Sequence, residues 1–210
     1  GAIDIVCAAQ QDNGYLDTYY IINDMSKVFT NLRDNHELYC FGHLTEGAVA
    51  YYEATGKDKL LNAARRFADY VYDCFGEEEG KKKGYPGHEI AEMALMRLYD
   101  VTGEEKYRRL AEFFINRRGT RPYYFDEEHP EVVKKGHENE LRYFYHQAHL
   151  PVREQDEAFG HSVRAVYLYS GMADVARVDD DDALYEACLK LWNNVTQKKM
   201  YVTGGIGATH

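Results

Sequence analysis

Histidines stand near the starts of three almost uncharged helical segments of the chain. These are His43 in segment 36–54, His88 in segment 88–101 and His161 in segment 158–176. Imidazole rings can bind metal ions, transfer protons or form hydrogen bonds with ligand hydroxyls. If the three segments run side by side in one direction, their histidines meet at one end of a bundle. The spacing therefore predicts a binding site at that end.

The first segment carries further polar side chains on the face of His43. His36, Cys40 and His43 are spaced i, i+4 and i+7, so they share a helix face and could place two nitrogens and a sulfur around zinc. No fourth ligand is evident, and such a face more often packs inward; His36 can also serve simply as a helix cap. Glu46, one turn beyond His43, fits either proton transfer with a shifted pKa or a structural hydrogen bond.

The bulk composition narrows the class of partner. The chain has 210 residues, 45% of them hydrophobic, which is enough to form the core of one large domain or of part of one. A net charge of −10, with no basic cluster beyond 81–83, argues against a nucleic-acid partner. No apolar run approaches the roughly 20 residues that cross a bilayer, so we expect no membrane partner.

Four cysteines are widely separated and form no Cys-x-x-Cys pair. This pattern predicts buried free thiols in a reducing compartment, and hence a cytoplasmic protein. The four are Cys7, Cys40, Cys74 and Cys188.

An internal repeat organises the chain. Residues 52–67 match residues 99–114 at an offset of 47, with Tyr, Thr, Gly, Lys, Ala and Phe recurring, and a weaker third copy covers 172–192. Repeats of this size are usually helix pairs that bury their apolar faces against neighbouring copies. Gly56 and Gly103 are predicted to end the first helix of each pair as C-caps.

The two helices of each pair differ in polarity. Segment 88–101 is apolar nearly all round, which predicts an inner helix, whereas 104–118 has one charged face and predicts an outer helix. The alternation predicts an all-α fold forming part of an (α/α)6 toroid. The expected pairs are 36–75, 88–118 and 158–198. Since a closed toroid needs about twice as many helices, we expect 1–210 to be an incomplete catalytic domain of a longer protein.

The connection 119–157 breaks the helical pattern and is rich in aromatic residues and histidines. Long connections inside a compact domain often carry function. The alternative is a partly disordered insertion, and the sequence leaves both interpretations open.

Six motifs follow one another in the order of a known family. They lie at 10–19, 36–44, 84–88, 151–155, 160–165 and 199–207. The chain resembles the β-L-arabinofuranosidases of glycoside hydrolase family 127 over essentially its whole length. The resemblance implies an (α/α)6 barrel followed by β-sandwich domains, and a retaining mechanism in which a zinc-bound cysteine thiolate is the nucleophile and a glutamate is the acid/base.

The resemblance also divides the site residues between this chain and the rest of the protein. None of the four cysteines matches the family's nucleophile or zinc ligands, so we expect no catalytic or metal-binding residue in this chain and zinc only in the full-length protein. What it implies here is substrate binding. The matching residues are His43, His88 and His161, together with His149, Arg153 and Gln155 at further motif positions.

The resulting expectation is the sugar-binding portion of a glycosidase that acts on L-arabinofuranosides or related sugars and is inactive as an isolated chain. One alternative is another (α/α)6 sugar enzyme, such as an epimerase or an unsaturated uronide hydrolase. A second is a non-catalytic helical-repeat scaffold. Inner helices such as 88–101, uncovered on one side, would favour a homo-oligomer, because large apolar patches tend to associate.

Overall fold

Three pairs of long helices form the frame of the molecule. The computed structural model describes residues 1–134 and 140–207, and within them the fold is helical, with one isolated bridge between Phe75 and Lys82. The first pair is α3 (Glu37–Thr55) and α4 (Lys59–Cys74), the second α5 (Ala91–Thr102) and α6 (Glu105–Arg117), and the third α10 (Ser162–Asp179) and α11 (Asp182–Asn194). The predicted all-α class is confirmed, and the fold is consistent with part of an (α/α)6 barrel.

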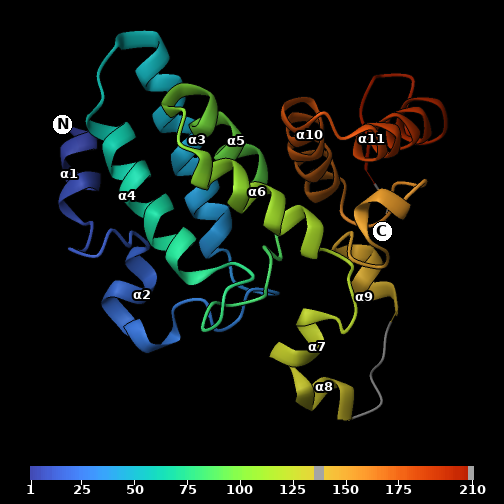
Figure 1. Ribbon diagram of the computed structural model, residues 1–210, viewed down its shortest axis with the longest axis horizontal. Helices are drawn as coiled ribbons and strands as arrows, with labels where there is room; N and C mark the ends of the chain where they lie inside the picture. Colours follow the sequence, from blue (N-terminus) through green and yellow to red (C-terminus); the bar gives the residue numbers. More distant parts are fainter. Residues whose placement is uncertain (135–139, 208–210) are drawn as a thin grey trace.

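The first helix of each pair lies on the inner side, and α5 packs between α3 and α10. Glycines allow both close approaches. A Cβ atom on Gly42 of α3 would lie 2.6 Å from Cγ2 of Ile90, and one on Gly171 of α10 would lie 2.9 Å from Cβ of Glu92. Because both residues lack a side chain, the backbones of α3 and α10 can pack closely against the start of α5. Figure 1 shows the pairs α3/α4 and α5/α6 side by side, with α10/α11 next to them.

The outer helices present one apolar face to this layer. In α6 the residues Tyr107, Leu110 and Phe114 are buried at helical spacing, while the opposite face is charged. The Tyr107 hydroxyl donates a hydrogen bond of 2.9 Å to Asp69 of α4, which joins neighbouring outer helices.

The inner helices end in left-handed C-caps. Gly56 has φ 69° and Gly103 has φ 68°, and their backbone N–H groups bond to the carbonyl oxygens of Tyr52 and Tyr99. The two predicted caps are confirmed. The third copy places Asp180 in the same conformation, with φ 51°, because short polar side chains tolerate this region better than most residues.

Shorter elements complete the chain. Before the first pair come α1 (Ala2–Ala8), α2 (Thr18–Asn23) and the 3-10 turn η1 (Met25–Lys27); after the last comes a π-helical turn, η3 (Val195–Lys199). Among the described residues, none of the four cysteines is buried: Cys40 is exposed and the others are partly exposed, so the expectation of buried thiols was wrong.

The connection 119–157 contains regular structure rather than an extended loop. It holds α7 (Tyr124–Glu128), α8 (Pro130–Lys134), α9 (Glu140–Tyr145) and the 3-10 turn η2 (Val152–Glu154), and its residues 135–139 lie outside the described part. Each helix is only one or two turns long, which is too short for helical periodicity to reveal in the sequence.

Helix α5 is covered by α3, α6 and α10, contrary to the expectation that 88–101 is uncovered on one side. An exposed stripe lies on α3, where Cys40, His43, Gly47 and Ala50 share one face. Val163 and Val166 of α10 are exposed as well. In the described part of the chain, no helix combines the length and the apolarity that crossing a membrane requires.

Candidate functional site

Aromatic rings from all three inner helices gather at one end of the layer. The ring centroids of His36 and His88 lie 5.6 Å apart, and those of His88 and His161 lie 5.7 Å apart. Tyr39 of α3 packs edge-on against His88 at 4.3 Å. The start of each inner helix therefore contributes a histidine to one cluster, as expected for helices that run in the same direction.

His43 belongs to the same cluster one turn further along α3. Its ring lies 4.4 Å from Tyr39 and 5.9 Å from Tyr167 of α10, and Tyr167 also lies 6.4 Å from His88. His43 is exposed. The structure thus brings together the three histidines that the sequence singled out. We call this group, His36, Tyr39, His43, His88, His161 and Tyr167, the histidine cluster.

His36 joins the cluster although the sequence suggested a cap. It occupies the N-cap position of α3, but its side chain makes no cap hydrogen bond. The predicted position is therefore right, but the ring does not cap the helix: it is exposed and packs against Tyr39 and His88.

Two histidines present opposite hydrogen-bonding groups. In His88, Nδ1 lies 3.0 Å from the carbonyl oxygen of Glu89; a carbonyl only accepts, so Nδ1 carries the proton and Nε2 is left as an acceptor. In His161, the side chain caps α10 by accepting from the backbone N–H of Arg164, which leaves Nε2–H as a donor. A ligand hydroxyl, which both donates and accepts, matches this pair.

Both rings are held neutral. Burial lowers the pKa of His88 to about 4, helped by the positive charge of Arg164 and by the neighbouring His36 and His161. The pKa of His161 is also lowered, first by burial and then by Arg164. Neutral imidazoles suit uncharged hydroxyl groups better than carboxylates or phosphates.

Arg164 ties α10 to the loop that carries His88. Its Nη1 donates to the carbonyl oxygen of Gly87 at 3.0 Å, and it is buried. The same Nη1 lies 2.5 Å from Nδ1 of His146, which itself lies 3.0 Å from the Gly87 carbonyl oxygen. Burial lowers the pKa of His146 to about 3, so this ring stays neutral. The stacked Tyr145 ring, 4.7 Å from the guanidinium, covers it on one side.

A second buried arginine, Arg118, binds the loop that carries His88. Arg118, with no exposed surface, donates to the carbonyl oxygens of Pro86 at 2.6 Å and His146 at 2.8 Å. It also forms ion pairs with Glu89 at 2.9 Å and Glu92 at 3.1 Å. Burial raises the pKa of Glu89 against the opposing charge of Arg118. Together, Arg118 and Arg164 bind the backbone carbonyls of the two residues before His88, Pro86 and Gly87.

The other predicted substrate-binding residues make different contacts. Arg153 forms an ion pair with Asp181, the N-cap of α11, and donates to Asn116 of α6 at 2.6 Å. The buried amide of Gln155 donates to the carbonyl oxygens of Gln147 and Leu150, which stabilises that turn. Neither is brought to the histidine cluster by these contacts.

His149 lies in the connection between α9 and η2. Its ring stacks on Phe144 at 4.3 Å, and its Nδ1 is buried without a hydrogen-bond partner among the described residues. It lines a hollow separate from the histidine cluster.

Glu46 lies deeper along α3. It is half-buried, and its Oε1 has no hydrogen-bond partner in the described chain. Burial raises the pKa of Glu46. The positive charge of Arg97 on α5 lowers this pKa, and the negative charge of Asp174 on α10 raises it further.

The zinc hypothesis for His36, Cys40 and His43 finds no support. In ranges 1–134 and 140–207, no three His, Cys, Asp or Glu side chains are placed to hold a metal ion.

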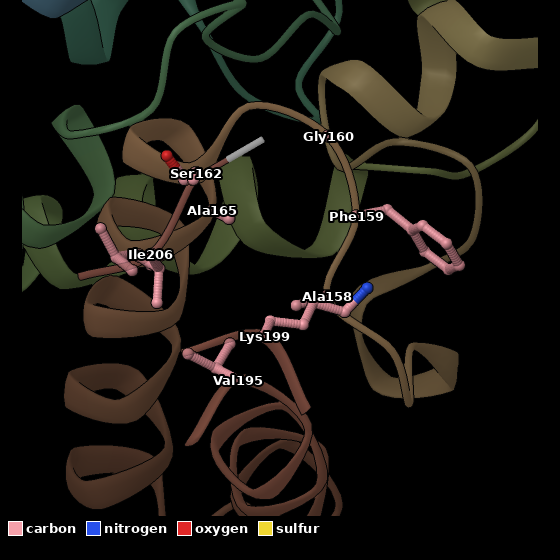
Figure 2. Close-up of a pocket in the computed structure, with 10 residues that line it drawn as sticks. Ala158, Phe159, Gly160, Ser162, Ala165, Val195, Lys199 and Ile206 are labelled. Atoms are coloured by element: carbon pink, nitrogen blue, oxygen red, sulfur yellow. The ribbon is translucent and has the colours of Figure 1, made fainter. Parts of the chain in front are cut away.

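The glycine-rich motif near the end of the described chain borders a hollow of its own. This hollow, about 310 Å³, lies where the start of α10 faces η3 and Ile206. Figure 2 shows Ile206 and Val195 beside the helix, while Lys199 extends toward Phe159. The amino group of Lys199 lies 4.9 Å from the Phe159 ring and pairs with Glu157 at 2.9 Å.

Sequence reasoning missed several residues that build the site. Tyr39 lies three residues after His36 and four before His43, so helical spacing could have placed it on their face. Arg164 follows His161 by three residues, a spacing that could have placed it near the histidine. Arg118 carries no such signal, because a charged residue at the end of an outer helix is normally solvated.

Known proteins are similar to this chain over nearly its whole length. The family model for the catalytic domain of GH127 β-L-arabinofuranosidases matches residues 1–210. A non-reducing end β-L-arabinofuranosidase of Bifidobacterium longum subsp. longum is 39% identical over 216 residues, covering 99% of this chain and 33% of that protein.

Solved structures agree with this match. The crystal structure of a GH127 β-L-arabinofuranosidase from Geobacillus stearothermophilus T6 is 50% identical with a TM-score of 0.91, covering 99% of this chain and 33% of that chain. A structure of another GH127 β-arabinofuranosidase is 44% identical with a TM-score of 0.84, covering 99% and 31%. The chain thus spans about a third of the length of these relatives. The resemblance noted in the sequence is confirmed: the chain belongs to the GH127 glycoside hydrolase family and matches its catalytic domain.

Proposed function

We propose that the full-length protein is a retaining glycosidase that cleaves terminal β-L-arabinofuranosides, and that this chain supplies the groups that hold the terminal sugar. The relatives are named for this activity. The observation that carries the proposal is the histidine cluster, where rings from three inner helices converge.

The hydrogen-bonding pattern of the cluster supports a sugar ligand. His88 offers an acceptor and His161 a donor, and their rings lie 5.7 Å apart. Neighbouring hydroxyls on a sugar ring each donate and accept, so one hydroxyl can satisfy each histidine. The tyrosine rings beside them add apolar surface with a polar end, as sugar-binding sites commonly require.

The charge of the cluster favours a neutral sugar over a uronide. A carboxylate would need a cation, and neutral His88 and His161 do not supply one. The buried guanidinium of Arg164 is already engaged by Gly87 and His146. An unsaturated uronide hydrolase is therefore the less suitable assignment for this site.

Among the described residues, no three His, Cys, Asp or Glu side chains are placed to hold a metal ion. Cys40, the cysteine on the exposed stripe of α3, has a pKa raised by partial desolvation and by the charges of Asp17 and Glu37, which keeps its thiol protonated. The nucleophile, the acid/base and the zinc ligands are accordingly proposed to come from other parts of the full-length protein, and no step is assigned here to Cys40.

Kinetics with a simple aryl glycoside test the proposal. We expect the full-length protein to cleave an aryl β-L-arabinofuranoside, and the His88→Ala variant to do so at least tenfold less efficiently. We also expect the isolated 210-residue chain to show no hydrolysis. Absence of cleavage by the full-length protein would remove the glycosidase assignment, and robust cleavage by the isolated chain would place the catalytic groups within it.

Calorimetric titration separates the enzyme from a helical-repeat scaffold. L-Arabinose should bind the full-length protein and bind the His88→Ala variant more weakly. A protein that releases no heat with L-arabinose or its oligosaccharides would behave as a scaffold.

A further inference from the structure

A second hollow, of about 520 Å³, lies in the connection between α6 and α10. We call it the aromatic basin. Six of its lining residues matter for the argument: Tyr123, Asp126, Tyr143, Phe144, His149 and Phe159. They come from the start of α7, from α9 and from the turns around η2. The volume falls within the range of small-molecule sites, roughly 300–1,000 Å³.

The basin lies close to the surroundings of the histidine cluster. A neighbouring hollow of about 350 Å³ is lined by Phe144 and Phe159, which also line the basin, and by Tyr145 and Gly160. The ring of Tyr145 lies 5.6 Å from that of His161. Tyr145 therefore connects the histidine cluster to the rings that both hollows share.

Aromatic rings form the basin walls in a fixed arrangement. Tyr123 and Tyr143 stack at 3.8 Å with planes 22° apart, and Phe144 and His149 stack at 4.3 Å with planes 17° apart. Phe159 meets both Phe144 and His149 edge-on. Rings that already pack on one another lose little freedom when a ligand arrives, which favours binding.

His149 supplies a polar atom that lacks a partner. Its Nδ1 is buried, and no described residue forms a hydrogen bond with it. A buried polar atom without a partner destabilises the protein, so a ligand hydroxyl beside it would be favoured. Burial lowers the pKa of His149, although the negative charge of Asp156 acts in the opposite direction. The ring is therefore neutral, with one nitrogen that donates and one that accepts.

The charges around the basin select a neutral ligand. Asp126, Asp156 and Arg121 are the charged residues that line it, which leaves one excess negative charge beside a neutral imidazole. Carboxylates accept hydrogen bonds from hydroxyls but repel acidic sugars. An anionic ligand is therefore disfavoured.

We propose that the aromatic basin binds a second, neutral sugar residue of an oligosaccharide whose terminal residue occupies the histidine cluster. This inference rests on the proposed glycosidase function and deepens it. The protein would then recognise a chain of sugars rather than a single terminal residue, with Tyr145 between the two positions.

The test compares two substrates in the full-length protein. An aryl β-L-arabinofuranoside offers no hydroxyl to His149 beyond its terminal sugar, whereas a β-L-arabinofuranosyl oligosaccharide places a second sugar with hydroxyls there. His149→Phe keeps the stack on Phe144 but removes both ring nitrogens. Tyr185→Phe, which removes a polar atom from an exposed ring of α11, is the matched control. Thermal unfolding of each variant checks that it is folded.

The expected result is a loss confined to the longer substrate. His149→Phe should lower kcat/KM for the oligosaccharide about three- to tenfold, as removal of one hydrogen bond does, and leave the aryl glycoside within twofold. The control should change neither. Equal losses on both substrates, or no loss on either, would overturn the basin as a sugar site. If His149→Phe does not fold, Asp126→Asn provides the same comparison.

Failure of the proposed function gives a different result. If the unmodified protein cleaves neither substrate, the glycosidase assignment fails and calorimetry with the same oligosaccharide decides on the basin alone. Binding that is weakened by His149→Phe would support the basin. Binding unaffected by His149→Phe, or no binding, would overturn it.

Discussion

Nδ1 of His88 lies 3.0 Å from the carbonyl oxygen of Glu89, the next residue in the chain. This contact fixes the tautomer of the ring and leaves Nε2 free to accept from a ligand. Because Glu89 is itself buried against Arg118, the carbonyl cannot easily turn away. The donor and acceptor pattern of the site is thus set by buried groups behind it.

The first prediction concerns that ring. In long-range ¹H–¹⁵N spectra of the ¹⁵N-labelled protein, His88 should show the tautomer protonated at Nδ1 and a titration midpoint near 4, because burial disfavours its charged form. A histidine in the denatured protein, titrating near 6.5, is the internal reference. A His88 ring protonated at Nε2, or titrating near 6.5, would contradict the hydrogen bond to Glu89.

The second prediction concerns His36 and His43. Both rings are exposed, so His36→Ala and His43→Ala should change the unfolding free energy by no more than about 0.5 kcal/mol. Each should lower kcat/KM of the full-length protein on an aryl β-L-arabinofuranoside about 10- to 100-fold, because a sugar hydroxyl left buried without a partner costs about 1–3 kcal/mol. Lys190→Ala, at an exposed position of α11, should change neither quantity. Normal kinetics of a histidine variant would remove that residue from the site.

The third prediction concerns Arg118. Arg118→Met removes the partner of Glu89 and Glu92 and leaves buried carboxylates uncompensated, which costs about 3–5 kcal/mol. Urea unfolding should show this loss, whereas Arg109→Met, at an exposed position of α6, should stay within about 0.5 kcal/mol of the parent. A small loss at Arg118 would mean that the ion pairs contribute little to holding the loop of His88.

The fourth prediction concerns Glu37, buried at the start of α3. Its Oε1 accepts from the Tyr15 hydroxyl at 2.7 Å, and both oxygens accept from the backbone N–H of Phe29. Burial raises its pKa to about 7 against these hydrogen bonds. Between pH 4.5 and 7 the folded state keeps a proton that the unfolded state has lost, so the contribution of Glu37 to stability falls as pH rises.

Glu37→Gln isolates this contribution, since the amide oxygen can accept the same bonds. As pH rises from 5 to 7, the unfolding free energy of the parent should fall relative to that of the variant, by up to about 1.4 kcal/mol per pH unit. Glu79→Gln, at an exposed position, should show no such trend. A difference independent of pH would show that Glu37 is ionised throughout.

The helical frame was predictable because its signals are local. The offset of 47 residues between repeats predicted the pairs, and the glycines at 56 and 103 predicted their caps, since both depend on residues close in sequence. Asp180 escaped prediction as the third cap because it adopts a conformation that glycine prefers.

The support beneath the site was not predictable from the same patterns. Arg118 bonds to residues 26 and 32 positions earlier, and Arg164 bonds to Gly87, 77 positions away. Charged residues are normally expected at the surface, so sequence polarity pointed the other way. The short helices of 119–157 escaped for a different reason: their sequences are too brief to show a period.

Arg164 joins the segments of His88 and His161 through a single guanidinium, whereas no described hydrogen bond restrains the side chains of His36, His43 or Tyr39. The two sides of the cluster therefore differ in how easily their side chains can move. The rings of α3 can shift to accommodate ligands of different size, whereas His88 and His161 set one constant spacing between two hydroxyls. Selection among sugar stereoisomers would then depend on His88 and His161. The rings of α3 would determine which substituents on the sugar are tolerated.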